Sequence, residues 1–320
     1  MIQTESVCQR LHQQWPGLEI AIEQIHTTGD RVTNVPLSKI GGDGVFVTEI
    51  ERALQERRID LAVHSLKDLP TVQPDGVKLV ILGPREDVRD VFVSNAEFQL
   101  VDGRLMPVQA IQTTPLRIGT CSLRRTAQIL LHYPDAEILS LRGNVDTRLR
   151  KLEAGLYDGI VLAAAGLHRM ELPAQLAGRI TYFPVNLMLP APGQGALAIE
   201  LRDEPELCSL LAPLNDRVTQ ATTTAERMFM RRLGAGCYLP VATYSEITNE
   251  QLLLHGLVIS LDGQRQVRVQ QEMPWRAETR MEYAEALGIS AAEQALAQGA
   301  DAIIQELESD GSREQERQRV

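Results

Sequence analysis

The fold of this chain is constrained most by the regular alternation of short apolar runs and helix-like stretches over its first ~190 residues. The apolar runs include LEIAIEQI from Leu18, IDLAVHSL from Ile59, LRIGT from Leu116, AEILSLR from Ala136 and DGIVLAAAGL from Asp158. Helix-like stretches such as SLRRTAQILLHY follow them. This alternation is typical of buried parallel strands covered by helices, so it predicts α/β domains.

The pattern changes after about residue 217. ATTTAERMFMRRLG reads as a helix, and two strand-like runs, QLLLHGLVISL and RQVRVQQEM, flank the hairpin signal Asp262-Gly263. A further helix is expected over about 278–307. The last third therefore predicts a separate α+β domain.

Composition excludes several classes of protein. The 320 residues carry a net charge of −10, which is unsuited to general nucleic-acid binding. No stretch approaches the ~20 apolar residues that span a membrane, and the N-terminus lacks the pattern of a secretion signal. The four cysteines show no zinc-binding spacing, and the histidines show no metal motif, so we expect no metal. Scattered cysteines fit a reduced cytoplasm.

The predicted strand ends carry an unusual number of cationic side chains. In open parallel sheets, ligands bind outside the carboxyl ends of the strands, and arginine binds carboxylate or phosphate bidentately. We therefore expect a polyanion site in which Asp68, the one obvious carboxylate, stabilises developing positive charge or shuttles a proton. The other residues expected there are Ser65, Lys67, Thr120, Ser122, Arg124, Arg125, Arg142, Arg148 and Arg169.

Two further segments stay ambiguous from the residues alone. The loop KIGGDG lacks the Gly-Lys-Ser/Thr ending of a nucleotide-binding loop, and it fits either a mobile lid or an ordinary glycine turn. Cys237 lies in RLGAGCYLP, after Gly234 and Gly236 and before Pro240, where a ligand could approach its thiol. A lone cysteine without a basic partner is, however, more often inert than nucleophilic.

Five motifs, taken together, closely resemble the porphobilinogen deaminase (hydroxymethylbilane synthase) family, from about residue 3 to about 307. They are HSLKDLP, GTCSLRR, LRGNVDTRL, LPAPGQGALAIE and AERMFMRRLGAGCYLPVATY. The resemblance implies two doubly wound α/β domains, similar to periplasmic binding proteins, and a small C-terminal α+β domain. The implied division is 1–84 with 196–214, then 89–190, then 217–308, with 309–320 as a disordered tail.

The resemblance also implies the reaction, in which four porphobilinogens condense head to tail into linear hydroxymethylbilane and release ammonia. This step serves haem, sirohaem or chlorophyll synthesis, and such enzymes are generally cytoplasmic monomers. Each pyrrole brings an acetate and a propionate, which explains the cationic residues. Asp68 would be catalytic, and Cys237 would hold a dipyrromethane cofactor through a thioether as a permanent primer.

The resemblance assigns further roles residue by residue. The loop residues Lys39, Gly41, Gly42 and Asp43 would form a lid, and Ser65, Arg142, Arg148 and Arg169 would bind porphobilinogen and the growing oligopyrrole chain. The implied cofactor-binding residues besides Cys237 are Lys67, Asp68, Thr120, Ser122, Arg124, Arg125, Gly166 and Gln194.

The chain departs from the family pattern at three places. Family members begin with a strand and an Arg-Gln-Ser-Pro turn, whereas this chain begins at the following helix. Asp43 stands where the family loop usually has lysine, and Thr28 replaces an arginine. We expect the native reading frame to start upstream of Met1. If the chain is complete, we expect a truncated deaminase with weak or absent activity.

Two other hypotheses remain open from the sequence. A non-catalytic anion-binding protein on the same scaffold would not need the loop thiol of Cys237, whereas a deaminase needs it for priming. A phosphoryl-transfer enzyme would need a nucleotide loop or metal-binding carboxylates at the strand ends, and neither is evident.

Overall fold

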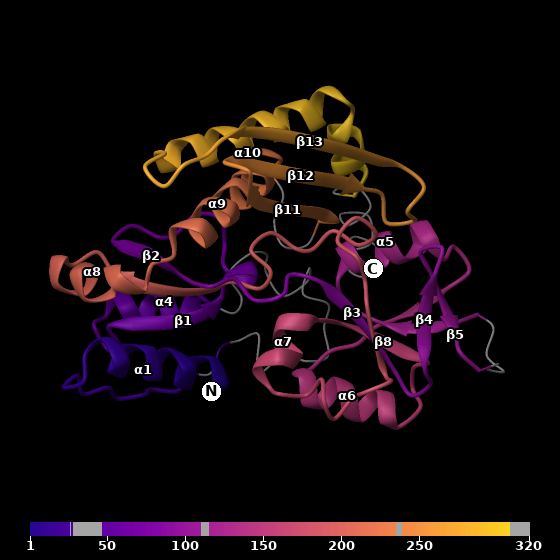
Figure 1. Ribbon diagram of the computed structural model, residues 1–320, viewed down its shortest axis with the longest axis horizontal. Coiled ribbons are helices and arrows are strands. Elements are labelled where there is room, and N and C mark those ends of the chain that lie inside the picture. Colours follow the sequence, from indigo (N-terminus) through magenta and orange to yellow (C-terminus); the bar gives the residue numbers. More distant parts are fainter. Residues whose placement is uncertain (26, 28–46, 110–114, 235–238, 308–320) are drawn as a thin grey trace, which may run out of the picture.

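The computed structural model describes residues 1–25, 27, 47–109, 115–234 and 239–307. Three groups of elements are visible in Figure 1. The N-terminal elements lie at the left, the middle of the chain lies at the right, and the C-terminal strands and helices lie across the top.

The N-terminal group is built on a three-stranded sheet in the order β1 (Leu61–Ser65), β10 (Leu197–Arg202), β2 (Val77–Leu82). Both pairings are antiparallel, with Ile199 opposite Val63 on one side and Val80 on the other. The prediction of parallel strands is therefore wrong for this sheet. The cause is long-range, because the chain returns after the middle group and inserts β10 between β1 and β2, whose own directions agree.

Helices cover both faces of this sheet. On one face, Leu197, Ile199 and Leu201 of β10 belong to the same apolar cluster as Val7 and Leu11 of the first helix. On the other face, Ala198 clusters with Val47 and Leu66. The helices of this group are α1 (Ile2–Gln14), α4 (Thr48–Gln55), α8 (Pro205–Leu211) and the short 3₁₀ helices η1 (Leu66–Asp68) and η2 (Ala212–Leu214).

Residues 18–25, which the sequence predicts as a strand, pair with no other strand in the described part of the chain. Leu18 and Ile20 instead pack half-buried against the cluster that contains Val7 and Leu11. The apolar alternation of this segment therefore reflects packing of one side on the core and no sheet ladder.

The middle group is a five-stranded sheet in the order β7 (Glu137–Leu139), β6 (Arg117–Gly119), β8 (Gly159–Ala163), β3 (Asp90–Ser94), β9 (Ile180–Tyr182). Strand β6 is parallel to β7 and β8, as predicted, whereas β3 is antiparallel to β8 and β9. Its helices are α5 (Leu123–His132), α6 (Val145–Glu153) and α7 (Ala164–Arg169), and a hairpin joins β4 (Phe98–Val101) to β5 (Arg104–Pro107).

The C-terminal group matches the α+β prediction. It contains α9 (Arg217–Arg232), the antiparallel strands β11 (Val241–Thr248), β12 (Gln251–Ile259) and β13 (Gln266–Pro274), and α10 (Met281–Ala297). The predicted hairpin at Asp262-Gly263 joins β12 to β13. Gly256 of β12 leaves room for the fully buried ring of Phe229, since a Cβ there would lie 2.5 Å from that ring.

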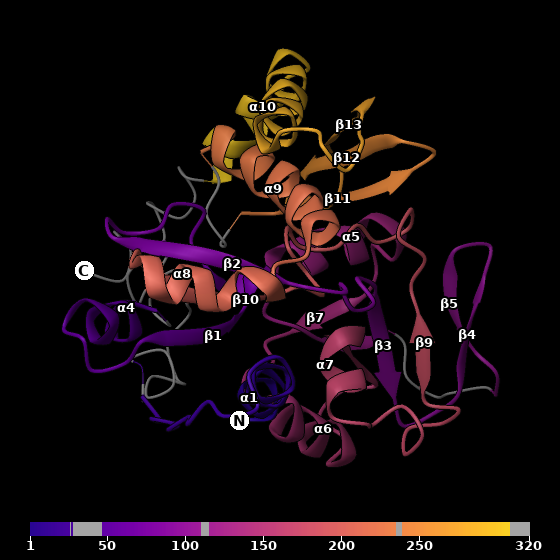
Figure 2. The ribbon, with the colours of Figure 1, turned by 60° about the vertical axis from the view of Figure 1, so that its left-hand side comes forward.

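Two chain segments, residues 83–89 and 190–196, connect the N-terminal sheet to the middle sheet, and we call them the paired connections. The C-terminal group contacts both other groups. Its helix α9 lies against β2 of the N-terminal group, and its strand β12 lies against α5 of the middle group. Figure 2 shows α9 above β2, with its upper end beside α10.

Candidate active site

The first part of the site lies where β1 leaves the N-terminal sheet. Ser65 ends the strand, and its Oγ accepts a hydrogen bond from Nε2 of Gln3 at 3.0 Å. Helix η1 follows at once and carries Lys67 and Asp68, while the fully buried side chain of Leu66 anchors the turn. The carboxylate-bearing residue Asp68 is exposed, so its position is set by the backbone of this short turn.

The second part lies where β6 leaves the middle sheet. Thr120 follows the strand, and its Oγ1 accepts a hydrogen bond from the backbone N–H of Ser122 at 3.1 Å. Ser122 is the N-cap of α5, and its side chain accepts from the N–H of Arg125 at 3.4 Å. A serine at this position satisfies one of the free donors of the first helical turn, which explains why the helix starts here.

Arg124 and Arg125 are both buried, and both pair with the fully buried carboxylate of Asp90 at 2.7 Å. Their remaining contacts are to main-chain oxygens, from Arg124 to Leu189 at 2.7 Å and from Arg125 to Val161 at 2.9 Å.

Gln194 links these buried charges to the turn after β1. Its Nε2 donates to Oδ1 of Asp90 at 3.0 Å, and its Oε1 accepts from Nζ of Lys67 at 3.2 Å. We call Asp90, Arg124, Arg125 and Gln194 the inner cluster. Through Lys67 it joins residues of the middle sheet to the turn that follows β1.

A second set, which we call the outer cluster, consists of Lys67, Asp68, Arg142 and Arg148. Arg142 and Arg148 are half-buried, and Arg148 Nε donates to the carbonyl of Gly143 at 2.7 Å. Burial lowers the pKa of Arg148, and the neighbouring cations Arg125 and Arg142 lower it further, although Asp68 acts in the opposite direction. The charges of Asp68 and Arg142 thus act on the guanidinium of Arg148.

The remaining predicted residues lie on α7, which follows β8. Arg169 Nη2 donates to the carbonyl of Gly195 at 2.6 Å, so this guanidinium lies against the paired connections. A Cβ at Gly166 would lie 3.9 Å from Val145, which is an ordinary van der Waals contact, so the helix alone does not require glycine at this position.

Two pKa shifts describe the electrostatics of the two clusters. Burial by itself would raise the pKa of Asp90, but the guanidinium groups of Arg124 and Arg125 outweigh it and hold that pKa well below its usual range. Burial lowers the pKa of Lys67 to about 8, helped by Arg125 and Arg124 and opposed by Asp68. The inner cluster is thus charge-compensated, whereas burial keeps the pKa of Lys67 at about 8.

Sequence reasoning missed Asp90, the residue that organises the inner cluster. It opens the fully buried strand DVFVS, and a carboxylate at the edge of such an apolar run requires a buried partner. That pattern could have indicated an ion pair. Its partners, however, follow 34 and 35 residues later, too far for a local motif to identify them.

Several predicted residues lie outside the described part of the chain. They are Cys237, the lid residues Lys39, Gly41, Gly42 and Asp43, and the residue of the third family departure, Thr28. Within the described residues, no three His, Cys, Asp or Glu side chains are grouped so that they could hold a metal ion. No helix in the described ranges is long and apolar enough to cross a membrane.

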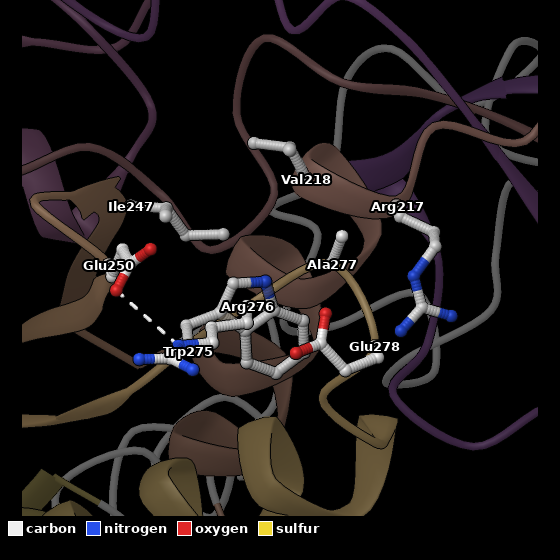
Figure 3. A pocket seen from close by; sticks show the side chains of 8 residues that line it. All are labelled: Arg217, Val218, Ile247, Glu250, Trp275, Arg276, Ala277 and Glu278. Atoms are coloured by element: carbon white, nitrogen blue, oxygen red, sulfur yellow. Dashed lines mark ion pairs between the residues drawn. The ribbon is translucent and has the colours of Figure 1, made fainter.

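A pocket of about 700 Å³ lies elsewhere, in the C-terminal group, and contains none of the predicted site residues (Figure 3). Trp275 forms part of its wall, and Arg276 pairs with Glu250 at 3.4 Å across its edge. The lining residues are Arg217, Val218, Ile247, Glu250, Trp275, Arg276, Ala277 and Glu278.

The chain matches two family descriptions that together cover most of its length. Residues 1–209 match "Porphobilinogen deaminase, dipyromethane cofactor binding domain", and residues 220–297 match "Porphobilinogen deaminase, C-terminal domain". Among solved structures, a "Putative L-Cystine ABC transporter from Listeria monocytogenes" is 11% identical, with a TM-score of 0.36 over 67% of this chain and 78% of that one. A likeness of that strength carries no argument about function.

Curated relatives match along nearly their whole length. Porphobilinogen deaminase of Syntrophotalea carbinolica is 45% identical over 307 residues, which are 96% of this chain and 92% of that protein. The deaminase of Laribacter hongkongensis is 44% identical over 312 residues, which are 97% and 96% of the two chains. By these family descriptions and relatives, the chain belongs to the porphobilinogen deaminase family.

Proposed function

We propose that the inner and outer clusters form the active site at which this deaminase condenses four porphobilinogens head to tail into hydroxymethylbilane. The observation that carries the proposal is the coupling of Lys67, on the turn that bears Asp68, to the buried pair of arginines through Gln194. This coupling supports a single site built from the ends of β1 and β6. Porphobilinogen and the growing oligopyrrole chain are its ligands.

The chemistry requires a group that stabilises the positive charge developing on the substrate. Each porphobilinogen loses ammonia as its aminomethyl C–N bond breaks, and this leaves an electron-poor methylene carbon. The free pyrrole carbon at the end of the growing chain forms the new C–C bond and then loses a proton. We assign to Asp68 the stabilisation of that positive charge, with its carboxylate accepting the pyrrole N–H hydrogen bonds and able to accept a proton.

The cationic side chains bind the carboxylates of substrate and product. Each added pyrrole brings an acetate and a propionate, and guanidinium groups bind such carboxylates through charge-assisted hydrogen bonds. Arg142, Arg148 and Arg169, with Ser65, are assigned to the growing chain. The described hydrogen bonds of Arg148 and Arg169 go to peptide carbonyls, which supports this role because a carboxylate is a stronger acceptor for a guanidinium.

The donor set also fits a dipyrromethane cofactor, whose carboxylates match the ammonium of Lys67 and the N-terminus of α5 at Ser122. When bound, a dipyrromethane supplies the pyrrole end at which chain growth starts. Cys237 is proposed to hold it through a thioether, and the lid role proposed for Lys39, Gly41, Gly42 and Asp43 likewise concerns residues outside the described part. The other proposed cofactor contacts are Lys67, Asp68, Thr120, Ser122, Arg124, Gly166 and Gln194, with Arg125 supporting them from behind.

The buried pairing with Asp90 gives Arg124 and Arg125 a more specific part in this proposal. Arg125 uses all its guanidinium nitrogens on Asp90 and the carbonyl of Val161, whereas the contacts of Arg124 in the described residues use only Nη1. We assign to Arg125 the support of the site and to Arg124 both support and a cofactor contact.

The proposal also covers the oligomeric state and the cellular location of the protein. We propose a cytoplasmic monomer that acts in tetrapyrrole synthesis, without a nucleic-acid or membrane partner. Free thiols at Cys8, Cys121 and Cys208 support a reducing compartment. The hydrophobic clusters support three folding units, at 1–84 with 196–214, at 89–190 and at 217–308.

Intact-mass measurement tests the proposed priming. The purified holoenzyme should be heavier than its sequence by one dipyrromethane, and Cys237→Ser should remove the increment together with hydroxymethylbilane formation. Cys208→Ser, which changes a half-buried thiol of α8, is the matched control and should keep both. A wild-type protein without the increment, or an increment that survives Cys237→Ser, would contradict the proposed cofactor attachment and favour a non-catalytic anion-binding protein.

A further inference from the structure

The long helix α9 belongs to the core of the C-terminal group, but two of its residues reach out of that core. Ala221, Ala225 and Phe229 are fully buried in the C-terminal apolar cluster. Arg227 instead points away from that cluster, and its guanidinium contacts the turn after β1, which carries Asp68. Its Nη1 donates to the carbonyl of Leu69 at 3.2 Å, and its Nη2 donates to the carbonyl of Pro70 at 2.6 Å.

These two carbonyls belong to the residues directly after Asp68. Helix η1 spans only three residues, and Leu69 already leaves it with an extended backbone. Pro70 has no N–H group, so the chain cannot form a regular ladder at this point. Arg227, nine per cent exposed, therefore adds charged donors to a bend whose other described hydrogen bonds run from the N–H of Leu69 to Leu66 and from Nε2 of Gln73 to the carbonyl of Pro70.

The preceding residue, Glu226, holds this part of α9 in place and so fixes the backbone position of Arg227. Glu226 is fully buried and binds the guanidinium of Arg85 through both oxygens at 2.8 Å. It also accepts from the backbone N–H groups of Gly193 and Ser245, each at 2.7 Å. Because the acceptor sites of Glu226 are well satisfied, this part of α9 is held firmly against the paired connections.

The same connection packs directly beneath the turn. A Cβ on Gly193, whose φ is +73°, would lie 3.0 Å from Cγ of Leu66, the buried residue of η1. The turn is thus held between the loop at Gly193 on one side and Arg227 on the other. The exposed side chain of Asp68 has no such packing, so its location follows the backbone.

We propose that Arg227 is a positioning residue for Asp68, through which the C-terminal domain sets the geometry of the reaction. This inference rests on the proposed role of Asp68. Arg227 does not touch the substrate in this proposal; it holds the carbonyls of Leu69 and Pro70 so that the carboxylate of Asp68 stays in reach of the reacting pyrrole. A displacement of about 1 Å at such a group can cost on the order of 10²-fold in rate.

A double-mutant cycle on the holoenzyme tests the proposal. Arg227→Gln should lower kcat by about 10- to 100-fold with KM changed less than about threefold, and Arg227→Lys should recover part of the loss. In an Asp68→Ala background, Arg227→Gln should cost less than about threefold, because the residue that it positions is gone. The matched control is Arg217→Gln on the same helix, which removes a hydrogen bond to the carbonyl of Thr279 and should leave kcat unchanged.

Hydrogen exchange of the peptide covering residues 61–72 provides a readout that does not depend on activity. Arg227→Gln should speed exchange there, including at the N–H of Leu69 that donates to Leu66, and Arg217→Gln should not. Unchanged exchange, or an equal loss of kcat in both backgrounds, would overturn the positioning role. Faster exchange together with full activity of Asp68→Ala would instead overturn the proposed role of Asp68, and Arg227 would then hold a turn without catalytic consequence.

Discussion

Asp90 is fully buried between two arginine side chains, whereas Asp68 is exposed at the end of a short helix. The surroundings of the two carboxylates define the inner and outer clusters. In the inner cluster, Arg124 and Arg125 use their donors on Asp90 and on main-chain oxygens. In the outer cluster, the described hydrogen bond of Arg148 goes to a peptide carbonyl, at Gly143.

The comparison shows that cationic side chains in the two clusters have different roles. Buried cations require a buried carboxylate, because an uncompensated charge away from water is costly. Half-buried cations beside peptide carbonyls keep their attraction for a carboxylate that arrives from outside. The inner cluster therefore supports the site, and the outer cluster is suited to ligand.

The largest expected effect is a loss of kcat when the carboxylate of Asp68 is removed. Asp68→Ala should lower kcat by about 10²- to 10⁴-fold, the usual contribution of a positioned acid–base group, while the free energy of unfolding changes by less than about 0.5 kcal/mol. Steady-state assays of hydroxymethylbilane formation and a urea titration measure both quantities. Asp75→Ala, which changes another exposed aspartate soon after the turn, is the control and should leave both unchanged. Wild-type turnover in Asp68→Ala would remove the assigned role.

Asp90→Asn should produce the opposite result, a loss of stability. Removing the one carboxylate between Arg124 and Arg125 leaves two buried cations uncompensated, which costs about 3–5 kcal/mol of unfolding free energy. Asp203→Asn, which breaks the exposed pair with Lys78, should leave the denaturation midpoint nearly unchanged. Equal denaturation midpoints for Asp90→Asn and the wild-type protein would show that the inner cluster does not support the fold.

A smaller effect should appear in the pH profile, through Lys67. Its pKa of about 8 means that the ammonium form, which binds carboxylate, dominates below pH 8 and is lost as the pH rises through that value. We therefore expect kcat/KM to fall by up to about tenfold between pH 7 and pH 9. Lys67→Arg should move this decline to higher pH, since a guanidinium stays charged. Superimposable profiles for the two proteins would exclude Lys67 as the titrating group.

Much of the fold could be predicted from local pattern. The strands around Ile118, Ile138 and Ile160, and the hairpin at Asp262-Gly263, follow from apolar runs and turn residues that lie within a few positions of one another. The antiparallel insertion of β10 between β1 and β2 could not, because its partners are more than 100 residues away.

The residues of the candidate site likewise differ in whether the local sequence could predict them. Lys67, Asp68 and Ser122 could be predicted because each follows a strand directly, where the chain must leave the core. Asp90 could not be placed, because a single buried carboxylate gives no local sign of which distant arginines compensate it. Arg227 was missed for a related reason, since a helix that packs in one domain gives no sequence signal that one residue reaches another.

The most direct test of the division between the clusters is the intact-mass distribution of the enzyme after limited porphobilinogen has been added to Arg142→Leu protein. Arg142 belongs to the outer cluster and makes no described ion pair with the inner one, so the substituted protein should fold normally and load its cofactor. We predict that enzyme carrying short oligopyrrole chains accumulates, because elongation lacks a carboxylate-binding cation. A distribution identical to that of the wild-type enzyme would contradict the account.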